Sequence, residues 1–296
     1  MPKVSVIIPT HNDIRYIAAC LDSVLSQTFE DFEIVIVDDS SSDCIKDVIG
    51  SYLNKGIRNI RYFHLGPCSL SAARHEGVKS SSGEFVAFLD SDDIWLPDKL
   101  RIQVKLLETD PGLGMVYSNV YFLIGKRSFL DNRKCYSGMV FDKLIEGNFI
   151  CISTALIRRE CIEKAGNFDV SLTNAEDYDI WLRIAKLVPV SYIDMPLVRY
   201  RCHRDNMGRG FENDIRYRIY VLEKLLARED ISEEEKKRIR QMISKWNFNL
   251  GIYLIKKATR LNPVSALLLC GWFLSLSRIR SVLKWRKIWK EASCAE

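Results

Sequence analysis

Three runs of apolar residues constrain the fold of this chain more than any other feature. They read KVSVIIPT, EIVIVDD and EFVAFLD, lie within about the first 90 residues, and each stops abruptly at polar residues. Segments with helical spacing of apolar residues, and a shorter strand at IRYFHL, separate them. Strands that are apolar throughout and joined through helices are typical of a parallel sheet covered on both faces. The sequence therefore predicts an α/β fold, with helices on both faces of a mostly parallel, Rossmann-like sheet.

The pattern becomes less regular along the chain. Helices and strands are mixed from about residue 101, with expected strands at GMVYSNVYFLI and ICISTALIRR. After about residue 213 the spacing is helical, and Ser232 precedes an acidic run as a helix cap would. Asp13 is the expected cap of the first helix. We expect one domain over residues 1–212 and a helical C-terminal region over residues 213–296.

Cysteine usage and the first residues indicate an intracellular protein. The nine cysteines are odd in number and scattered, and no two form a C-x-x-C pair. This pattern favours reduced thiols over a disulfide framework or a zinc site. The chain enters its first strand without the apolar stretch and cleavage site of a signal peptide. We therefore expect a cytoplasmic location.

Positive charge is concentrated near the C-terminus. Nine basic residues and no acidic one lie between Lys256 and Lys290, which leaves 34 basic against 38 acidic residues elsewhere. The apolar stretch 261–276 is shorter than the roughly 20 residues that span a bilayer, and tryptophans surround it. We expect peripheral contact of residues 261–290 with an anionic membrane surface, and no nucleic acid partner. The alternative is that residues 264–276 pack on the domain.

Carboxylates collect where the predicted strands end. The second run ends in Asp38 and Asp39, the third in Asp90, Ser91, Asp92 and Asp93, and the first in Pro9-Thr10-His11-Asn12. Loops after parallel strands share one edge of a sheet, so we expect these residues to converge there. Crowded carboxylates need a cation, and oxygen ligands favour Mg²⁺ or Mn²⁺, which typically also bind phosphate oxygens. A simpler reading of Asp93 is that it caps the next helix.

The chain contains four ordered motifs, which read VSVIIPTHN, SQTFEDFEIVIVDDSSSD, SAARHEGVKSSSGEFVAFLDSDD and GNFDVSLTNAEDYDIWLRIA. They resemble the motifs of the family 2 glycosyltransferases, which have the GT-A fold, and the resemblance covers roughly residues 3 to 206. It implies a GT-A catalytic domain over residues 1–212. It also implies transfer of one sugar, with inversion, from a nucleoside-diphosphate sugar to a hydroxyl acceptor. The Q-x-x-R-W signature of processive members is absent.

The resemblance assigns the donor side of the site residue by residue. Pro9, Thr10 and Asn12 would lie along the nucleotide, and Asp39 would accept a hydrogen bond from the base imide, which favours UDP- or dTDP-linked sugars. Arg74 would lie near the diphosphate, where a bidentate guanidinium suits the charge. One departure is His75, where the family usually has Asn.

The metal and the base follow from the same resemblance. Asp90 would lie near the ribose or sugar, and Asp92 would bind the divalent metal. His203 would be a second metal ligand, or else a hydrogen-bonded structural residue. Asp177, in the first turn of a helix, would be the general base, and Glu176 would orient the acceptor.

No motif in the sequence identifies the acceptor. By family habit it is a glycan or a lipid-linked intermediate of cell-surface polysaccharide or glycolipid biosynthesis. Two other functions compete with transfer. One is a D-x-D phosphohydrolase with Asp90 as nucleophile, and the other is a catalytically inactive module that binds nucleotide sugars.

Overall fold

The structure is a computed structural model that describes residues 1–42, 44–55, 57, 59–203 and 210–261. The chain divides into two compact units, residues 1–239 and residues 240–296. The first unit contains the whole sheet together with α9 (Gly210–Leu226). The predicted division after residue 212 stays a prediction.

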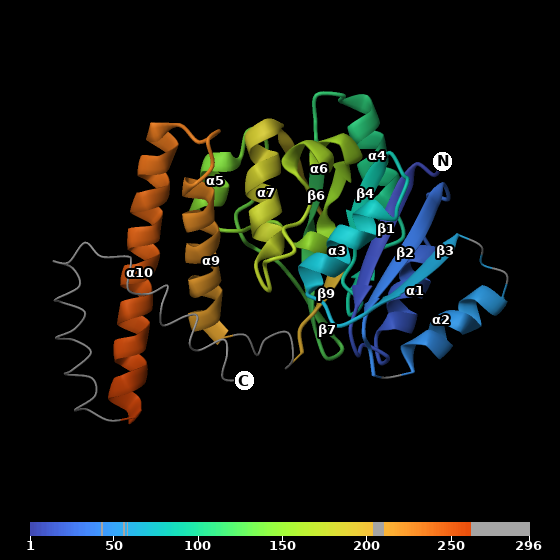
Figure 1. Cartoon of the computed structure of the whole chain (residues 1–296). Coiled ribbons are helices and arrows are strands. Elements are labelled where there is room, and N and C mark those ends of the chain that lie inside the picture. Colours follow the sequence, from blue (N-terminus) through green and yellow to red (C-terminus); the bar gives the residue numbers. More distant parts are fainter. Residues whose placement is uncertain (43, 56, 58, 204–209, 262–296) are drawn as a thin grey trace. The chain divides into compact units, whose positions relative to one another are not determined.

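Four parallel strands form the first half of the sheet (Figure 1). Their order is β3-β2-β1-β4, with β1 between β2 and β4. The strands are β1 (Val4–Thr10), β2 (Phe32–Asp39), β3 (Ile60–Leu65) and β4 (Phe85–Phe88). Every residue of β1 and β4 is buried, because helices cover both faces of these strands. The predicted parallel arrangement of the three apolar runs is confirmed.

The second half of the sheet contains both parallel and antiparallel pairs. β8 is antiparallel to β4 and β6, β6 is parallel to β9, and β5 and β7 add antiparallel edges. The strands are β5 (Ile94–Trp95), β6 (Met115–Ile124), β7 (Arg127–Leu130), β8 (Leu156–Arg158) and β9 (Val190–Arg201). The predicted strand over ICISTALIRR is largely wrong, because Ile152–Thr154 form a 3₁₀ helix and only the residues of β8 are extended.

Helices cover both faces of the sheet, as predicted. Even-numbered residues of β1 face one core together with α1 (Ile17–Leu25), α2 (Ile45–Asn54) and α4 (Lys99–Thr109). On the other face α3 (Leu70–Lys79) packs on β1 and β2, where Ala73 contacts Val35 and Val37. In Figure 1, α6 (Arg159–Ala165) and α7 (Glu176–Leu187) lie on the same side of the sheet as α3.

The structure confirms one of the two predicted helix caps. α5 (Phe141–Glu146) precedes the 3₁₀ helix, and α10 (Glu233–Leu261) follows Ser232. The Ser232 hydroxyl accepts the Glu235 N–H at 3.3 Å while the Glu235 carboxylate accepts the Ser232 N–H at 2.8 Å, so the predicted cap is confirmed as a capping box. The Asp13 cap is wrong. The first helix begins four residues later, at Ile17, and the Asp13 side chain accepts the Ser91 hydroxyl instead.

The helices that the structure describes include none that is both long and apolar enough to cross a membrane. The predicted membrane-contacting segment, 261–290, lies almost entirely outside the described residues, so that expectation stays a prediction.

A glycine in α3 sets how closely this helix approaches the sheet. A Cβ atom on Gly77 would lie 2.4 Å from Ile7 Cγ2 of β1, whereas a Cβ atom on Gly50 of α2 would have no atom within 4 Å. We expect Gly77→Ala to lower the free energy of unfolding by about 1–3 kcal/mol through overpacking. Gly50→Ala, the matched control, should raise it by up to about 1 kcal/mol because alanine favours a helix. Urea unfolding of both variants measures this, and shifts of the same sign would contradict the packing argument.

Candidate active site

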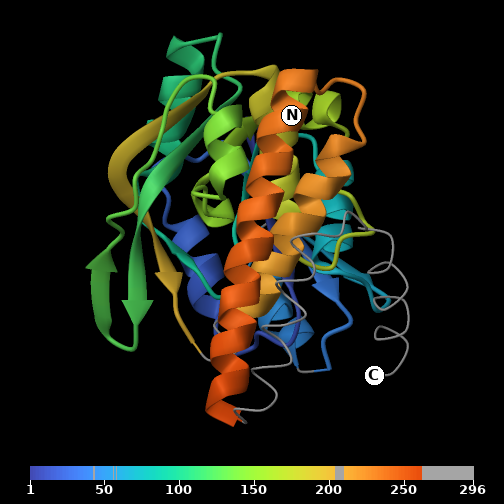
Figure 2. The ribbon, with the colours of Figure 1, turned by 90° about the vertical axis from the view of Figure 1, so that its left-hand side faces the viewer.

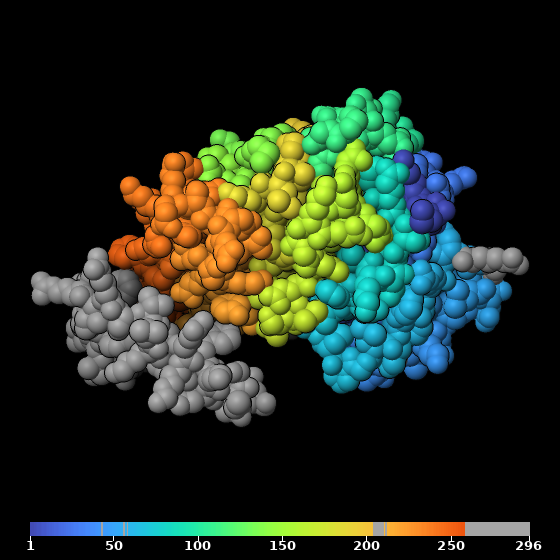
Figure 3. Space-filling model, turned by 45° about the horizontal axis from the view of Figure 1, so that its top comes forward, coloured from blue at the N-terminus to red at the C-terminus, as the bar shows by residue number. Residues whose placement is uncertain are grey.

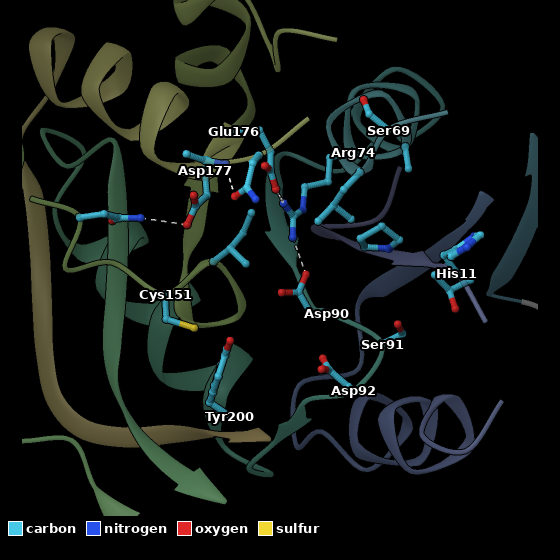
Figure 4. Close-up of a pocket in the computed structure, with 18 of the residues that line it drawn as sticks. His11, Ser69, Arg74, Asp90, Ser91, Asp92, Cys151, Glu176, Asp177 and Tyr200 are labelled. Atoms are coloured by element: carbon cyan, nitrogen blue, oxygen red, sulfur yellow. Dashed lines mark hydrogen bonds and ion pairs between the residues drawn. The ribbon is translucent and has the colours of Figure 1, made fainter. Parts of the chain in front are cut away.

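A pocket of about 800 Å³ lies where β1, β2 and β4 end (Figure 4). The predicted convergence of the three strand-end loops is confirmed, since residues of all three line the pocket. Eight predicted site residues are among those lining it. They are Pro9, Thr10, Asp39, Arg74, Asp90, Asp92, Glu176 and Asp177. The other two, Asn12 and His203, are not among the lining residues.

Asn12 connects the loops that follow β1 and β2. Its side-chain oxygen accepts the Ser42 N–H at 2.8 Å, and its own N–H donates to the Ser41 hydroxyl at 2.9 Å. Its φ of 56° lies in the left-handed region, where asparagine is better tolerated than most residues. Asn12 therefore shapes the loops beside the pocket, and its predicted contact with a nucleotide stays a prediction.

The two adjacent aspartates at the end of β2 have different surroundings. Asp38 is buried and accepts hydrogen bonds from the Tyr62 hydroxyl at 2.5 Å and the Ser41 N–H at 2.9 Å. Asp39 lines the pocket, and one of its oxygens accepts the Cys68 N–H at 2.7 Å. Only Asp39 is therefore placed to meet a ligand, and Asp38 holds the loop in position.

A buried arginine lies among the carboxylates of the pocket. The side chain of Arg74 is 2% exposed, and its guanidinium donates to Asp90 Oδ1 at 2.5 Å and to Glu176 Oε1 (Figure 4). Burial alone would lower the pKa of Arg74, but Asp90 and Glu176 outweigh it and the pKa is raised. Arg74 thus supplies positive charge to two carboxylates from distant parts of the chain.

This placement bears on the predicted role of Arg74. The guanidinium reaches the pocket, but its two terminal nitrogens each have a carboxylate partner. Direct contact with a diphosphate would require Arg74 to exchange one of these partners. That predicted contact stays a prediction.

Asp92 and His203 lie side by side next to the pocket. Asp92 Oδ2 is 2.8 Å from His203 Nε2, and both side chains are largely buried. Burial and the neighbouring Asp90 raise the pKa of Asp92, against the opposing effect of His203. Within the described residues no cluster of three histidine, cysteine or carboxylate side chains forms a metal site. The pair nevertheless fits Mg²⁺ or Mn²⁺, since such ions commonly complete their shell with phosphate oxygens and water.

Asp93 has a different role from the predicted helix cap. It is fully buried and accepts the Ser153 hydroxyl at 2.6 Å and the Arg201 N–H at 2.9 Å. The cap is wrong because a short strand, β5, follows Asp93, and α4 begins only at Lys99. Asp93 therefore connects the loop after β4 to β9 and to the 3₁₀ helix.

The N-terminus of α7 presents Glu176 and Asp177 to the pocket. Asp177 accepts the Tyr178 N–H at 2.7 Å and the Asn148 side-chain amide at 2.9 Å. Burial raises the pKa of Asp177 to about 6, with a further contribution from Glu176 and an opposing one from Arg74. A carboxylate with this pKa is ionised at neutral pH and still basic enough to accept a proton.

Several lining residues escaped sequence reasoning. They are Asp13, Asn148, Cys151, Tyr200 and Arg218, among others. Asp13 had a signal, since it directly follows the first strand-end motif, although its position also favours a helix cap. Asn148 and Arg218 had none, because nothing local marks a loop asparagine or a helical arginine as facing a distant pocket.

His75, the departure from the family motif, points away from the pocket. Its Nδ1 lies 3.0 Å from the Phe168 carbonyl oxygen, on the segment that precedes α7. On the same helix the Ser71 hydroxyl donates to the Asp169 carbonyl at 2.7 Å. The surfaces of α3 and of this segment lie side by side in Figure 3. His75 therefore belongs to the contact between α3 and this segment.

Comparison with known proteins gives a consistent result. The family described as Glycosyl transferase family 2 matches residues 5–166. A Rickettsia felis protein named as a glycosyltransferase is 31% identical over 221 residues, which cover 72% of this chain and 36% of that protein. The Escherichia coli UDP-Glc:alpha-D-GlcNAc-diphosphoundecaprenol beta-1,3-glucosyltransferase WfgD is 28% identical over 227 residues, covering 74% of this chain and 85% of WfgD. The chain spans about a third of the length of the first Rickettsia relatives.

Two solved structures share the fold. Staphylococcus aureus TarS in complex with UDP-GlcNAc matches with a TM-score of 0.67 and 20% identity, over 88% of this chain and 76% of TarS. The mannosyltransferase PcManGT from Pyrobaculum calidifontis, in complex with GDP-Man and Mn²⁺, has a TM-score of 0.60 and 20% identity, over 97% of this chain and 83% of that one. The predicted GT-A type fold is confirmed.

The buried ion pairs of Arg74 predict a large effect on stability. Arg74→Ala would leave Asp90 and Glu176 close together without a counter-charge, so we expect the free energy of unfolding to fall by about 3–5 kcal/mol. Arg101 is the control, since its side chain is 54% exposed and pairs with Asp98 at the surface. Arg101→Ala should change stability by less than about 1 kcal/mol. Denaturant unfolding measures both variants, and equal losses would show that the buried pairs do not stabilise the fold.

Proposed function

The chain belongs to glycosyl transferase family 2, and from this we propose that it transfers a single sugar from a nucleoside-diphosphate sugar to a hydroxyl acceptor with inversion. The observation that carries the proposal is the environment of Asp177. It lies in the first turn of α7, faces the pocket, and has a pKa of about 6. Glu176 and Arg74 connect it to Asp90 on the donor side.

The donor would occupy the pocket along the ends of β1 and β2. Thr10 supports this, because its side-chain hydroxyl is buried, lies in the pocket lining, and has no hydrogen-bond partner among the described residues. A ligand atom would satisfy it. Asp39 would accept the imide N–H of uracil or thymine, which makes a UDP- or dTDP-linked sugar the proposed donor. Of the two solved relatives, TarS holds UDP-GlcNAc and PcManGT holds GDP-Man, so the fold alone leaves the base open.

A divalent metal would be held by Asp92 and His203. When bound, Mg²⁺ or Mn²⁺ would neutralise negative charge that develops on the departing diphosphate. One relative of the same fold, PcManGT, was solved with Mn²⁺. The protein side of this site is the close pair of Asp92 Oδ2 and His203 Nε2.

The transfer step follows from the position of Asp177. Its carboxylate accepts the proton of the acceptor hydroxyl while the hydroxyl oxygen attacks the anomeric carbon of the sugar. The new carbon–oxygen bond forms as the bond to the diphosphate breaks, and the proton remains on Asp177. A single displacement from the face opposite the diphosphate inverts the anomeric centre. Arg74 limits the rise in the pKa of Asp177, which keeps the base ionised at neutral pH.

Glu176 is proposed to orient the acceptor. Its side chain is 5% exposed and is bonded to Arg74, so it acts beside Asp177 with its charge already balanced. Asp90 is proposed to contact the ribose or the sugar. Its side chain is bonded to Arg74 and is 27% exposed.

The acceptor would enter past the wall formed by β6 and β9. Val120, Phe122 and Tyr200 of these strands line the pocket with Arg133. The relative WfgD is named for a diphosphoundecaprenol-linked acceptor. We propose a lipid-linked or glycan acceptor in the synthesis of a cell-surface polysaccharide or glycolipid, at the cytoplasmic face of a membrane that residues 261–290 contact peripherally.

The two competing functions have less support. A phosphohydrolase would need Asp90 as a free nucleophile, whereas Asp90 is paired with Arg74. An inactive binding module would have no need for an aspartate whose pKa is raised to about 6 beside the donor site. Assay of transfer decides between these functions.

Removal of the proposed base should abolish sugar transfer and leave donor binding intact. We expect Asp177→Asn to lower kcat by about 10²–10⁴-fold, because proton abstraction is lost, and to leave the donor Kd within a few-fold. Release of the nucleoside diphosphate and calorimetric binding of the donor are the two measurements. Asp47→Asn, at an exposed position in the first turn of α2, is the control and should retain activity. Full transfer activity of Asp177→Asn would refute the assignment of Asp177 as the general base.

The same residue predicts a pH dependence. Asp177 must be ionised to accept a proton, and its pKa is raised to about 6. We therefore expect kcat/KM of the unmodified protein to fall about tenfold per pH unit below about pH 6 and to be flat just above it. A profile that is flat down to pH 4.5, on a chain that stays folded, would contradict this assignment.

The proposed metal ligands Asp92 and His203 predict that binding of the donor depends on a divalent metal. With UDP- or dTDP-sugar at a hundredfold excess over Kd, Mn²⁺ should raise the Tm by about 5–10 °C. Asp92→Ala should lose this increment, whereas Asp47→Ala should keep it. Thermal shift with UDP, GDP, CDP and dTDP sugars, with and without Mn²⁺, measures both. Absence of stabilisation by any of these nucleotides would count against nucleotide-sugar transfer.

A further inference from the structure

A hairpin of β6 and β7 projects apolar side chains into solvent. Every residue from 124 to 130 is exposed, including Ile124 at 52%, Phe129 at 50% and Leu130 at 46%. The strands join through a two-residue turn that begins at Gly125, whose φ of 61° suits glycine. In the described chain β7 pairs only with β6. Figure 2 shows the two strands as the green arrows at the lower left.

Positive charge accompanies these apolar residues. Lys126 and Arg127 occupy the tip, and Arg133 and Lys134 follow β7, all exposed. The only acid between residues 124 and 134 is Asp131, which is 8% exposed and bonded to Arg133 at 2.7 Å. Exposed apolar residues among basic residues, without exposed acids, favour the headgroup region of an anionic bilayer.

The apolar side of the hairpin continues into the pocket. Phe129 lies directly opposite Phe122 in the β6–β7 ladder, and residues directly opposite share one face of a sheet. Phe122 lines the pocket, and its ring packs edge-on against Tyr200 with centroids 5.9 Å apart. The Arg133 guanidinium lies 5.7 Å from the centre of the Phe122 ring. An aromatic and basic surface therefore leads from the pocket wall to the hairpin.

We propose that the hairpin of residues 121–134 docks on an anionic membrane surface, with Ile124, Phe129 and Leu130 entering the headgroup region and the four cations contacting lipid phosphates. A protein partner is less well matched, because the exposed surface is a narrow two-stranded ribbon with cations on both sides of its apolar residues. The hairpin would hold the mouth of the pocket at the membrane, where a lipid-linked acceptor is confined. This last step rests on the proposed function, and the docking itself does not.

Hydrogen exchange of the full chain tests the docking directly. Vesicles of phosphatidylglycerol and phosphatidylcholine should slow amide exchange in peptides from residues 121–134, and vesicles of phosphatidylcholine alone should not. Neither donor nor acceptor is present, so failure of the proposed transfer would leave this result unaffected. Unchanged exchange in the hairpin would overturn the proposal. Slower exchange in the absence of lipid, together with the molecular mass of a dimer, would also overturn the proposal, since it would identify a second copy of the chain as the occupant.

Variants separate the hairpin from other contacts. We expect Phe129→Ser with Arg127→Glu to weaken sedimentation with anionic vesicles by about tenfold or more. The control is Leu53→Ser with Lys55→Glu, which alters an exposed apolar and basic pair on and just after α2, away from the pocket. It should bind as the unmodified chain does. Circular dichroism confirms folding of each variant, and equal vesicle binding by both double variants would overturn the proposal.

Discussion

The ion pairs of Arg74 are the interaction on which the site depends. They join Arg74 to Asp90, which follows β4, and to Glu176, which begins α7. Arg74 and Glu176 are 102 residues apart in the sequence. Two carboxylates this close would repel each other in a medium of low dielectric constant, and a buried guanidinium removes that repulsion. Because Asp177 is adjacent to Glu176, the same cation also fixes where the proposed base lies relative to the donor pocket.

Strained backbone surrounds this arrangement. Three of the four non-glycine residues with positive φ in the described chain lie beside the pocket, namely Asn12, Ser40 and Ala175. Such conformations cost roughly 1 kcal/mol or more each. Local hydrogen bonds offset part of the cost, since Asn174 Oδ1 accepts the Ala175 N–H at 2.8 Å and the Ser40 hydroxyl donates to the Leu65 carbonyl at 2.9 Å. Ser40 directly follows Asp39, and Ala175 lies two residues before Asp177, so the strained turns stand beside two residues that line the pocket.

The sequence predicted the elements better than the role of each carboxylate. The position of β6 and the convergence of three strand ends follow from apolar spacing, which is a local property. Whether an aspartate faces the pocket depends on distant partners. Asp38 is engaged by Tyr62, and Asp93 by Ser153, and neither partner carries a local signal. The resemblance supplied the order of the motifs, but the partners of Arg74 appear only in three dimensions.

The two halves of the sheet divide the work of the proposed reaction. Parallel strands β1, β2 and β4 bring the proposed donor residues to one edge, where the nucleotide would lie in the proposed reaction. The proposed acceptor wall comes from β6 and β9, where the rings of Phe122 and Tyr200 pack against each other. The ion pairs of Arg74 lie between the loop after β4 and α7, so the β6–β7 hairpin can change without disturbing them. The end of β9 cannot, because the Arg201 N–H donates to the buried Asp93 at 2.9 Å. The hairpin is thus physically separable from the carboxylate cluster, whereas the end of β9, which is followed by His203, is coupled to it.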